Sequence, residues 1–305
     1  MSIRQAYSNQ ATVNTFILNS GDHGEDNEPL SFGAVSHSIT GVSAEASVSD
    51  SKLIIPARYE STSSVFSIST ATLNLKWFTI SLSSHASPNF HIVEVSEGGT
   101  VRIDGMLISS TMDTRLGKSV LNIGEGVLTC VNTGMQNIAL SSSPLISISM
   151  NDRRNNTVTM SCNSFENISR GNGDGSIFNI KIESALTFNI SKSNFTSCKA
   201  ESGSGGVIYI DLGTRGCLQL GEISGESSGE NEGCNFRKCT SSNYGGAVYI
   251  KTLYESQNRL STPAPVIQIY DCKFSECSTT SHENNAMLVE CLDPKSIINI
   301  NYWSG

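Results

Sequence analysis

The chain has 305 residues and a formal net charge of −8, and charged residues make up 16% of it. Few charges and many Ser, Thr, Asn and Gly residues are typical of short strands joined by tight turns. An acidic chain without a basic patch excludes nucleic acid and anionic membrane surfaces as its main partners. No apolar run in the sequence has the length of a signal peptide or of a membrane span, so we expect no direct membrane insertion.

The first 45 residues differ from the rest of the chain. Thr15–Leu18 predicts a strand, and the acidic, glycine-containing residues 21–29 predict a loop. Leu30–Val35 predicts the start of a short helix, with Ser31 as its N-cap and Leu30 packed on Val35. We therefore expect residues 1–45 to form an N-terminal strand and a capping helix that covers the open end of the core.

A short strand recurs along residues 46–305. Its second and fourth positions are apolar and the residue between them is mostly polar, which predicts one buried and one exposed face. The fourth position recurs at steps of 25 to 32 residues between Ile68 and Ile210. The pairs are Phe66/Ile68, Val93/Val95, Leu121/Ile123, Ile146/Ile148, Phe178/Ile180, Ile208/Ile210, Val248/Ile250 and Met287/Val289.

Each repeat also contains a second alternating strand, followed by a large apolar residue. The strand pairs are Leu73/Leu75, Val101/Ile103, Val158/Met160, Phe188/Ile190 and Ile267/Ile269. The large residues are Phe78, Met106, Met135, Phe165, Phe195, Phe236 and Phe274. One coil cannot bury its own apolar face, whereas coils stacked at about 4.8 Å form a continuous core. The sequence therefore predicts an all-β fold, a single right-handed parallel β-helix (β-solenoid) of about eight coils over residues 1–305.

Two later repeats are longer than the others. The spacing is 40 residues from Ile210 to Ile250 and 39 residues from Ile250 to Val289. We expect residues 213–233 and 252–265 to be loops that leave one side of the stack. The apolar residues of 297–300 predict a further strand close to the end of the sequence. Because a solenoid that ends in mid-coil exposes an unpaired edge, we expect the chain to be a fragment of a longer protein.

The later repeats share a fuller motif: a phenylalanine, a cysteine three residues further on, a polar turn, and Gly-Gly before the apolar strand. Phe195–Ile210 and Phe236–Ile250 fit this motif, and Phe274–Val289 has Asn284 and Asn285 in place of the glycines. These units resemble the repeats of chlamydial polymorphic outer-membrane proteins and of large β-helix surface proteins of some anaerobic protists. The order of strand, Gly/Asp loop, Pro, short helix and coils resembles the N-terminal entry of the pectate-lyase-like superfamily of right-handed parallel β-helix proteins. The resemblance implies adhesion, surface display or glycan binding at an extracellular or cell-surface location.

Five of the nine cysteines occupy repeat positions. Cys198, Cys239 and Cys277 lie three residues after the repeat phenylalanine, and Cys234 and Cys272 lie two residues before it. We interpret them as columns of buried free thiols, since free cysteine is among the most buried residue types. Two alternatives remain open. Cys234 with Cys239 and Cys272 with Cys277 could supply four thiolates to a zinc ion. Alternatively, the cysteines could form disulfides, and because their number is odd at least one thiol would be left unpaired.

Two sets of outward residues follow the repeat. Lys181, Asp211, Lys251 and Glu290 place opposite charges on successive coils, which predicts weak ion pairs and no catalytic role.

Tyr209 and Tyr249 share an outward position in adjacent coils. Stacked exposed rings can form a platform for the apolar faces of sugars, or they can be ordinary cross-strand partners. We name both tyrosines as candidate glycan contacts.

The sequence carries no catalytic signature. Glycosidases need paired carboxylates and calcium-dependent lyases need clustered acids, whereas Asp104, Asp113 and Asp152 lie far apart in the sequence. Residues 151–154 form the densest polar run, which predicts a solvated turn. No ligand spacing joins the histidines His23, His37, His85, His91 and His282. The glycosylation sequons begin at Asn155, Asn167, Asn189 and Asn194 and give weak support for secretion.

We expect a non-enzymatic β-solenoid, part of a surface or secreted protein, with no cofactor or metal and with carbohydrate or another surface protein as partner. The main alternative is a polysaccharide-active enzyme, a lyase or glycoside hydrolase, whose catalytic groups come from separate coils. A third possibility is a pure spacer. Clustered acids in an outward groove would favour the enzyme, exposed aromatic rings would favour binding, and a charge-balanced surface would favour the spacer.

Overall fold

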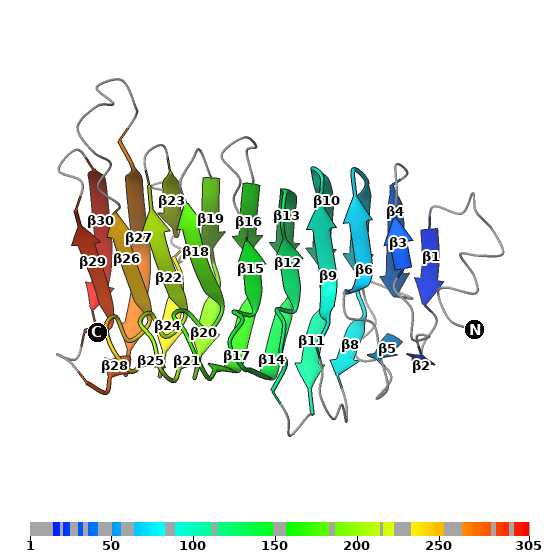
Figure 1. Ribbon diagram of the computed structural model, residues 1–305, viewed down its shortest axis with the longest axis horizontal. Helices are drawn as coiled ribbons and strands as arrows, with labels where there is room; N and C mark the ends of the chain where they lie inside the picture. The colour runs from blue at the N-terminus through cyan, green and yellow to red at the C-terminus, as the bar shows by residue number, and fades with distance from the viewer. Residues whose placement is uncertain are drawn as a thin grey trace.

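The computed structural model describes residues 15–18, 21–24, 30–32, 36–41, 51–55, 64–82, 89–111, 115–148, 157–182, 187–213, 216–222, 233–252, 264–281, 285–292 and 296–304. Within these ranges the secondary structure is entirely β, without a helix. The strands pair in parallel, coil upon coil, so the chain forms a β-solenoid. Figure 1 shows the strands side by side along one long axis, with β1 and β30 at opposite ends.

One face of the solenoid is a nine-stranded sheet. Its strands are β3 (Leu30–Phe32), β6 (Ser64–Ser69), β9 (His91–Ser96), β12 (Leu121–Ile123), β15 (Ile146–Ile148), β18 (Phe178–Ile182), β22 (Ile208–Leu212), β26 (Val248–Thr252) and β29 (Met287–Cys291). The eight predicted apolar pairs all lie in this sheet, in matching register. The predicted spacing of the repeat is therefore confirmed.

The remaining strands form a 21-stranded sheet that divides into two stacks by its pairings. The first stack contains β1 (Thr15–Leu18), β4 (His37–Gly41), β7 (Thr72–Lys76), β10 (Gly99–Asp104), β13 (Gly126–Val131), β16 (Thr157–Ser161), β19 (Thr187–Ser191), β23 (Cys217–Leu220), the first half of β27 (Val266–Ser275), and β30 (Ile297–Ser304).

The second stack follows the first along the chain of each coil. It contains β2 (Gly21–Gly24), β5 (Ser51–Ile55), β8 (Thr79–Leu82), β11 (Leu107–Ser110), β14 (Gly134–Leu140), β17 (Ser164–Arg170), β20 (Asn194–Thr196), β21 (Lys199–Ala200), β24 (Asn235–Arg237), β25 (Thr240–Ser241), the end of β27, and β28 (Ser278–Thr279).

The N-terminal region departs from its prediction in two places. The expected helix is wrong, because Leu30–Phe32 is strand β3, paired in parallel with β6; residues 33–35 lie outside the described residues. Leu30 and Phe32 align with Phe66 and Ile68, so this segment supplies a ninth apolar pair to the repeat. The expected loop is also wrong at Gly21–Gly24, which forms β2 and pairs with β5.

The longer repeats keep their strands in register. The predicted insertion at residues 213–233 is interrupted by β23, whose Leu218 and Leu220 pair with Phe188 and Ile190 of the coil before. Leu218 and Leu220 alternate with polar residues as in the other coils and are fully buried. The predicted strand near the end of the sequence is confirmed as β30.

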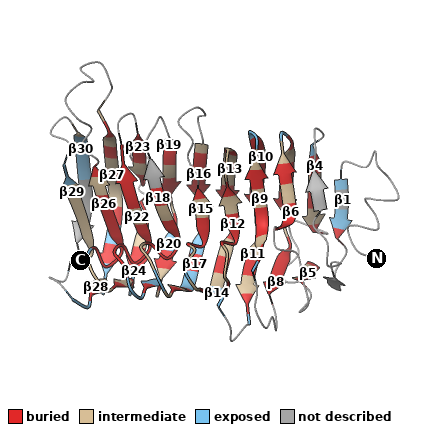
Figure 2. Ribbon diagram, viewed as in Figure 1, coloured by how far each residue is buried: buried red, intermediate tan, exposed pale blue. Residues whose placement is uncertain are grey.

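The apolar side chains from all three faces meet in one core that runs the length of the stack (Figure 2). Phe165, Phe195, Phe236 and Phe274 form a column inside it, with ring centroids 4.8–5.1 Å apart and nearly parallel planes. Offset stacking of this kind adds stabilisation beyond the area that each ring buries. The large residue that the sequence places after each second strand is thus a core residue.

A bend between the two stacks recurs in five successive coils of the described residues. Trp77, Gly105, Asn132, Cys162 and Lys192 each have a φ between +48° and +61°. This left-handed conformation is uncommon for residues other than glycine and turns the chain sharply. The bend places the residue that follows it at an inner corner of the core.

A buried polar column fills that inner corner. Its members are Thr133, Asn163, Ser193, Cys234 and Cys272, each at most 1% exposed. Asn163 Oδ1 accepts from the Thr133 amide at 3.0 Å, and its Nδ2 donates to the Cys130 carbonyl at 2.9 Å. Since an unpaired buried backbone group is costly, these side chains stabilise the corner by pairing such groups.

Two arginines hold the turns before the nine-stranded sheet. Arg170 is 6% exposed and donates to four backbone carbonyls, those of Ser142, Asn172, Asp174 and Gly175.

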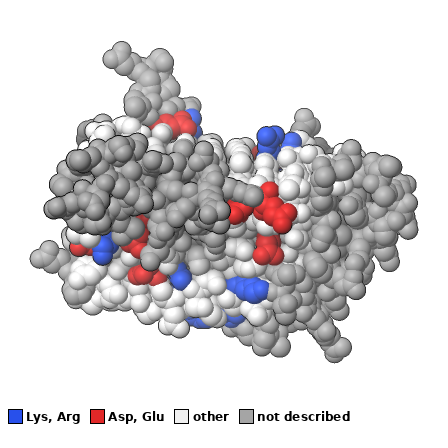
Figure 3. Space-filling model, turned by 45° about the horizontal axis from the view of Figure 1, so that its top comes forward, with Lys and Arg blue, Asp and Glu red and all other residues white. Residues whose placement is uncertain are grey.

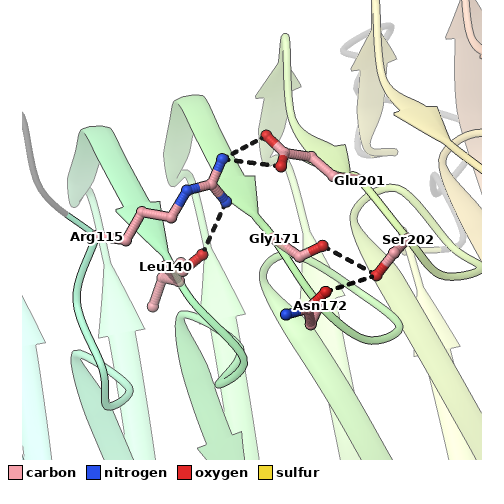
Figure 4. A network of polar contacts seen from close by, with 6 residues as sticks. All are labelled: Arg115, Leu140, Gly171, Asn172, Glu201 and Ser202. Atoms are coloured by element: carbon pink, nitrogen blue, oxygen red, sulfur yellow. Dashed lines mark hydrogen bonds and ion pairs between the residues drawn. The ribbon is translucent and has the colours of Figure 1, made fainter.

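The second arginine, Arg115, crosses the turn of a later coil (Figure 4). Its Nη2 donates to both Glu201 carboxylate oxygens at 2.8 Å and its Nη1 to the Leu140 carbonyl at 3.2 Å, while Ser202 Oγ donates to the Gly171 carbonyl at 2.9 Å. A Cβ at Gly171 would lie 2.6 Å from Arg115 Nη1, so glycine leaves the path open. Arg115 therefore braces several successive coils at once.

Candidate functional site

The two predicted tyrosines lie next to each other on the outer side of the nine-stranded sheet. Tyr209 of β22 pairs directly with Tyr249 of β26, and their ring centroids are 5.3 Å apart at an interplanar angle of 32°. The flanking residues Ile208 and Ile210 point into the core and are fully buried. Tyr209 is half-buried, but Tyr249 is only 6% exposed. The predicted position of the two tyrosines in adjacent coils is therefore confirmed, but their rings are tilted against each other, and Tyr249 is more enclosed than the sequence suggested.

A third tyrosine completes the cluster and was missed in the sequence. Tyr244 lies in the turn before β26, and its ring is stacked 6.0 Å from that of Tyr249. It is 43% exposed, so it presents the accessible aromatic surface of the group. The sequence feature that could have predicted this position is that Tyr244 directly precedes Gly245 and Gly246, the glycines that end the turn beside the outer face of β26. We call Tyr209, Tyr244 and Tyr249 the tyrosine cluster.

Carboxylates surround the tyrosine cluster. Tyr209 Oη donates to Asp211 Oδ1 at 3.0 Å, and Tyr249 Oη donates to Glu290 Oε2. Asp174 lies at the turn of an earlier coil, where its Oδ1 accepts from the Ser204 amide at 2.7 Å. Burial, and then the nearby carboxylates, raise the pKa of both the Tyr209 and the Tyr249 phenol. Both phenols are therefore neutral hydrogen-bond donors at physiological pH.

The outward charged residues Lys181, Asp211, Lys251 and Glu290 have the predicted backbone register, but their side chains have partners other than the predicted ones. Lys181 pairs with Asp211, Asp211 with Lys251, and Lys251 with Glu290 along the backbone. Within the described part of the chain, no ion pair joins Lys251 to either carboxylate, and the acids accept from tyrosines instead. The Lys181 side chain lies outside the described residues. The prediction of an ion-pair ladder is thus wrong for the side chains of Asp211, Lys251 and Glu290.

A polar column continues from the tyrosine cluster toward the N-terminal coils. Its members are the outward central residues of successive strands: Glu94, Asn122, Ser147 and Asn179. All four are half-buried, and Asn122 Nδ2 donates to Glu94 Oε1 at 3.3 Å. On the described part of the face drawn in Figure 3, the charges form small groups of both signs. The outer side of the sheet therefore offers amides, hydroxyls and carboxylates beside aromatic rings.

The cysteine columns are present as predicted, and none of the nine cysteines is in a disulfide. Cys198, Cys234, Cys239 and Cys272 are fully buried, and Cys277 is half-buried. Among the residues that the structure describes, no group of three His, Cys, Asp or Glu side chains could hold a metal ion. These columns therefore line the core, as the interpretation of buried free thiols predicts.

The other candidate residues do not gather. Asp104 accepts from Asn132 at 3.5 Å, whereas Asp113 and residues 151–154 lie outside the described residues. His37 is buried, and His91 Nδ1 contacts the Ser119 carbonyl at 2.7 Å; His85, His282 and the His23 side chain are not described. Burial is the main cause that lowers the pKa of His91.

Two of the sequon asparagines, Asn167 and Asn194, are exposed on the second stack. Asn189 is half-buried, and Asn155 lies outside the described residues.

Comparison with known proteins does not assign a family. No family model matches the chain, and no curated protein matches it significantly. The described residues also include no helix with the length and hydropathy needed to cross a membrane. The fold and the tyrosine cluster are therefore the basis for any functional argument.

Proposed function

We propose that this chain is a non-enzymatic binding solenoid of a surface or secreted protein, and that its tyrosine cluster contacts glycans. The observation that carries the proposal is the cluster of three tyrosines beside Asp174, Asp211 and Glu290 on the outer side of the nine-stranded sheet. Aromatic faces pack against the apolar faces of sugars, and carboxylates accept from sugar hydroxyls. Each carboxylate has more acceptor sites than the tyrosine donors occupy.

The resemblance of the later repeats to polymorphic outer-membrane proteins and protist surface proteins supports adhesion or display. The right-handed sense of the coils and membership of the pectate-lyase-like superfamily belong to this proposal as well, since right-handed crossovers are the rule for parallel strands in one sheet. A solenoid also suits an extended binding surface, because each coil adds the same strip of outer face.

The test measures binding to immobilised glycans with a single exposed ring removed. We expect Tyr244→Ala to reduce the retention of the bound glycan at least about tenfold, since one well-placed contact of about 1.4 kcal/mol changes affinity by that factor. Tyr270→Ala is the matched control, because Tyr270 is a half-buried tyrosine of β27 on the first stack. Equal binding by both variants, or no retention of any glycan by the native chain, would overturn the proposal.

A second candidate function, polysaccharide hydrolysis, rests on Asp211 and Glu290. They stand in one column, separated by Lys251, so their Cα atoms are two coil spacings or about 10 Å apart. Inverting glycosidases place their carboxyl groups about 6.5–9.5 Å apart, and side-chain rotation could reach that range. Release of shorter products that is abolished in Asp211→Asn and Glu290→Gln would replace the binding proposal with this one.

A further inference from the structure

A column of three thiols crosses the later coils of the second stack. Lys199 pairs with Thr240 and Thr240 with Ser278, which places the preceding residues Cys198, Cys239 and Cys277 directly in line. Parallel neighbours in a sheet lie about 4.8 Å apart. A disulfide requires Cα atoms about 4.4–6.8 Å apart, so each adjacent pair of this column has a separation that a disulfide can span.

The three sulfur atoms occupy equivalent positions in successive coils. Each donates to a backbone carbonyl of the coil before: Cys198 Sγ contacts the Phe165 carbonyl at 3.8 Å, Cys239 Sγ the Phe195 carbonyl at 3.4 Å, and Cys277 Sγ the Phe236 carbonyl at 3.4 Å. The shared register and the shared contact place the three thiols side by side along the stack.

Exposure distinguishes the members of the column. Cys198 and Cys239 are fully buried, whereas Cys277 is half-buried. A dissolved reagent can meet Cys277, and it can reach Cys239 only through Cys277. The other thiol pair, Cys234 and Cys272, has no such entry because both residues are fully buried.

We propose that Cys277 and Cys239 form an oxidisable pair that small disulfide compounds convert to a protein disulfide. The Cys277 thiol first loses its proton, and its sulfur attacks one sulfur of the small disulfide. The S–S bond of the reagent breaks, and one thiolate leaves with the electron pair. Cys239, deprotonated in turn, then attacks the Cys277 sulfur and displaces the second thiolate. The protein loses two hydrogen atoms and two electrons, and the small disulfide is reduced to two thiols.

The central position of Cys239 allows one further step. Cys198 can attack the Cys239 sulfur of the new bond, which forms a Cys198–Cys239 disulfide and releases Cys277 as a thiol. The column therefore holds one disulfide at a time, at either of two places. The neighbouring Cys239 thiol and burial raise the pKa of Cys277, so the rate of oxidation rises with pH.

This modification is independent of glycan binding and concerns the end of the described stack. The bond would join the residue before β25 to the residue before β28, in the same coil as strand β29, whose residues from Met287 to Glu290 are half-buried. A covalent link there would restrain separation of the outermost coils. In an oxidising compartment such a link persists, whereas cytosolic thiol systems keep it reduced.

The experiment uses the reduced full chain with its two exposed cysteines replaced, Cys162→Ser and Cys291→Ser. This double variant, in its folded state, is incubated with oxidised glutathione, and its intact mass and disulfide-linked peptides are measured. We expect the loss of two hydrogen atoms, and linked peptides containing Cys239 with Cys277 or with Cys198. The loss should become faster as the pH is raised.

Two variants test the entry point of the reagent. When Cys277→Ser is combined with the two starting substitutions, the mass loss should be abolished. The serine hydroxyl can still donate to the Phe236 carbonyl, so the contact at this turn is kept. Cys217→Ser, which changes a half-buried thiol on the first stack, should leave the mass loss unchanged. An unchanged mass of the native chain, a link between other cysteines, or equal oxidation of Cys277→Ser would overturn the proposal. The peptide map of the parent chain does not depend on whether either variant folds.

Discussion

The central coils and the later coils have the same strand register and fill their corners with different chemistry. In the central coils the inner corner holds Thr133 and Asn163, and in the later coils the same column holds Cys234 and Cys272. The turn column changes in the same way, from Ile168 to Cys198 and onward to Cys239. The comparison teaches that alternating apolar strands fix the register, while the corner accepts different side chains, from Phe78 and Met106 in earlier coils to the small polar and thiol residues that follow.

The largest expected effect on stability comes from replacing Arg170, the buried arginine of the central coils. Leucine fits this position in the preceding coil, where Leu140 pairs with Arg170. Arg170→Leu would nevertheless leave four backbone carbonyls without their hydrogen-bond donor. We expect a loss of about 3 kcal/mol in the free energy of unfolding, since each buried unpaired group costs about 1–3 kcal/mol and water can relieve part of it. Urea denaturation measures this loss.

The matched control for this change is Arg237→Leu. Arg237 is 60% exposed and pairs with Glu276 at 3.7 Å, so its removal should change stability by less than about 0.5 kcal/mol. If both leucine variants have the same unfolding midpoint, the buried guanidinium does not hold the turn.

A smaller effect is expected when the central corner receives the residue of the later corner. Asn163→Cys would remove the acceptor of the Thr133 amide and the donor to the Cys130 carbonyl. The expected loss is about 1–3 kcal/mol in the free energy of unfolding. Thermal denaturation at constant pH provides the measurement, and an unchanged melting temperature would show that the amide is dispensable.

The smallest effect is expected for the converse change in the later corner. Cys234→Ser replaces a thiol that donates to the Ile190 carbonyl, and Ser193 already fills the same column one coil earlier. The hydroxyl can make the same contact, so the stability should change by less than about 1 kcal/mol. A loss as large as that of Asn163→Cys would contradict the idea that these corners differ in their demands.

The sequence predicted the fold well where periodicity carries the information. The eight apolar pairs, from Phe66 with Ile68 to Met287 with Val289, all lie in one sheet with the expected register. Leu30–Phe32 was mistaken for a helix because a three-residue strand is shorter than the window in which a period of two becomes visible. Its pairing with β6 depends on a contact that only the folded chain makes.

The candidate site was predicted less completely. Tyr209 and Tyr249 were found because they occupy a repeat position, whereas Tyr244 lies in a turn, where the period does not apply. The partners of Asp211 and Glu290 were also missed, because register shows which backbones are adjacent and not which rotamer a side chain adopts. The Arg170 contacts with turn carbonyls had no sequence signal for the same reason.

The separation of register from coil length has a consequence for how such a chain can change. In one coil only two residues separate Ser191 of β19 from Asn194 of β20, while fourteen separate Leu220 of β23 from Asn235 of β24, yet Asn194 and Asn235 are directly paired. Insertions at this bend leave the hydrogen bonds on both sides intact. The solenoid can therefore acquire new segments at this bend, by mutation or by grafting in the laboratory, without any change in the packing of its core.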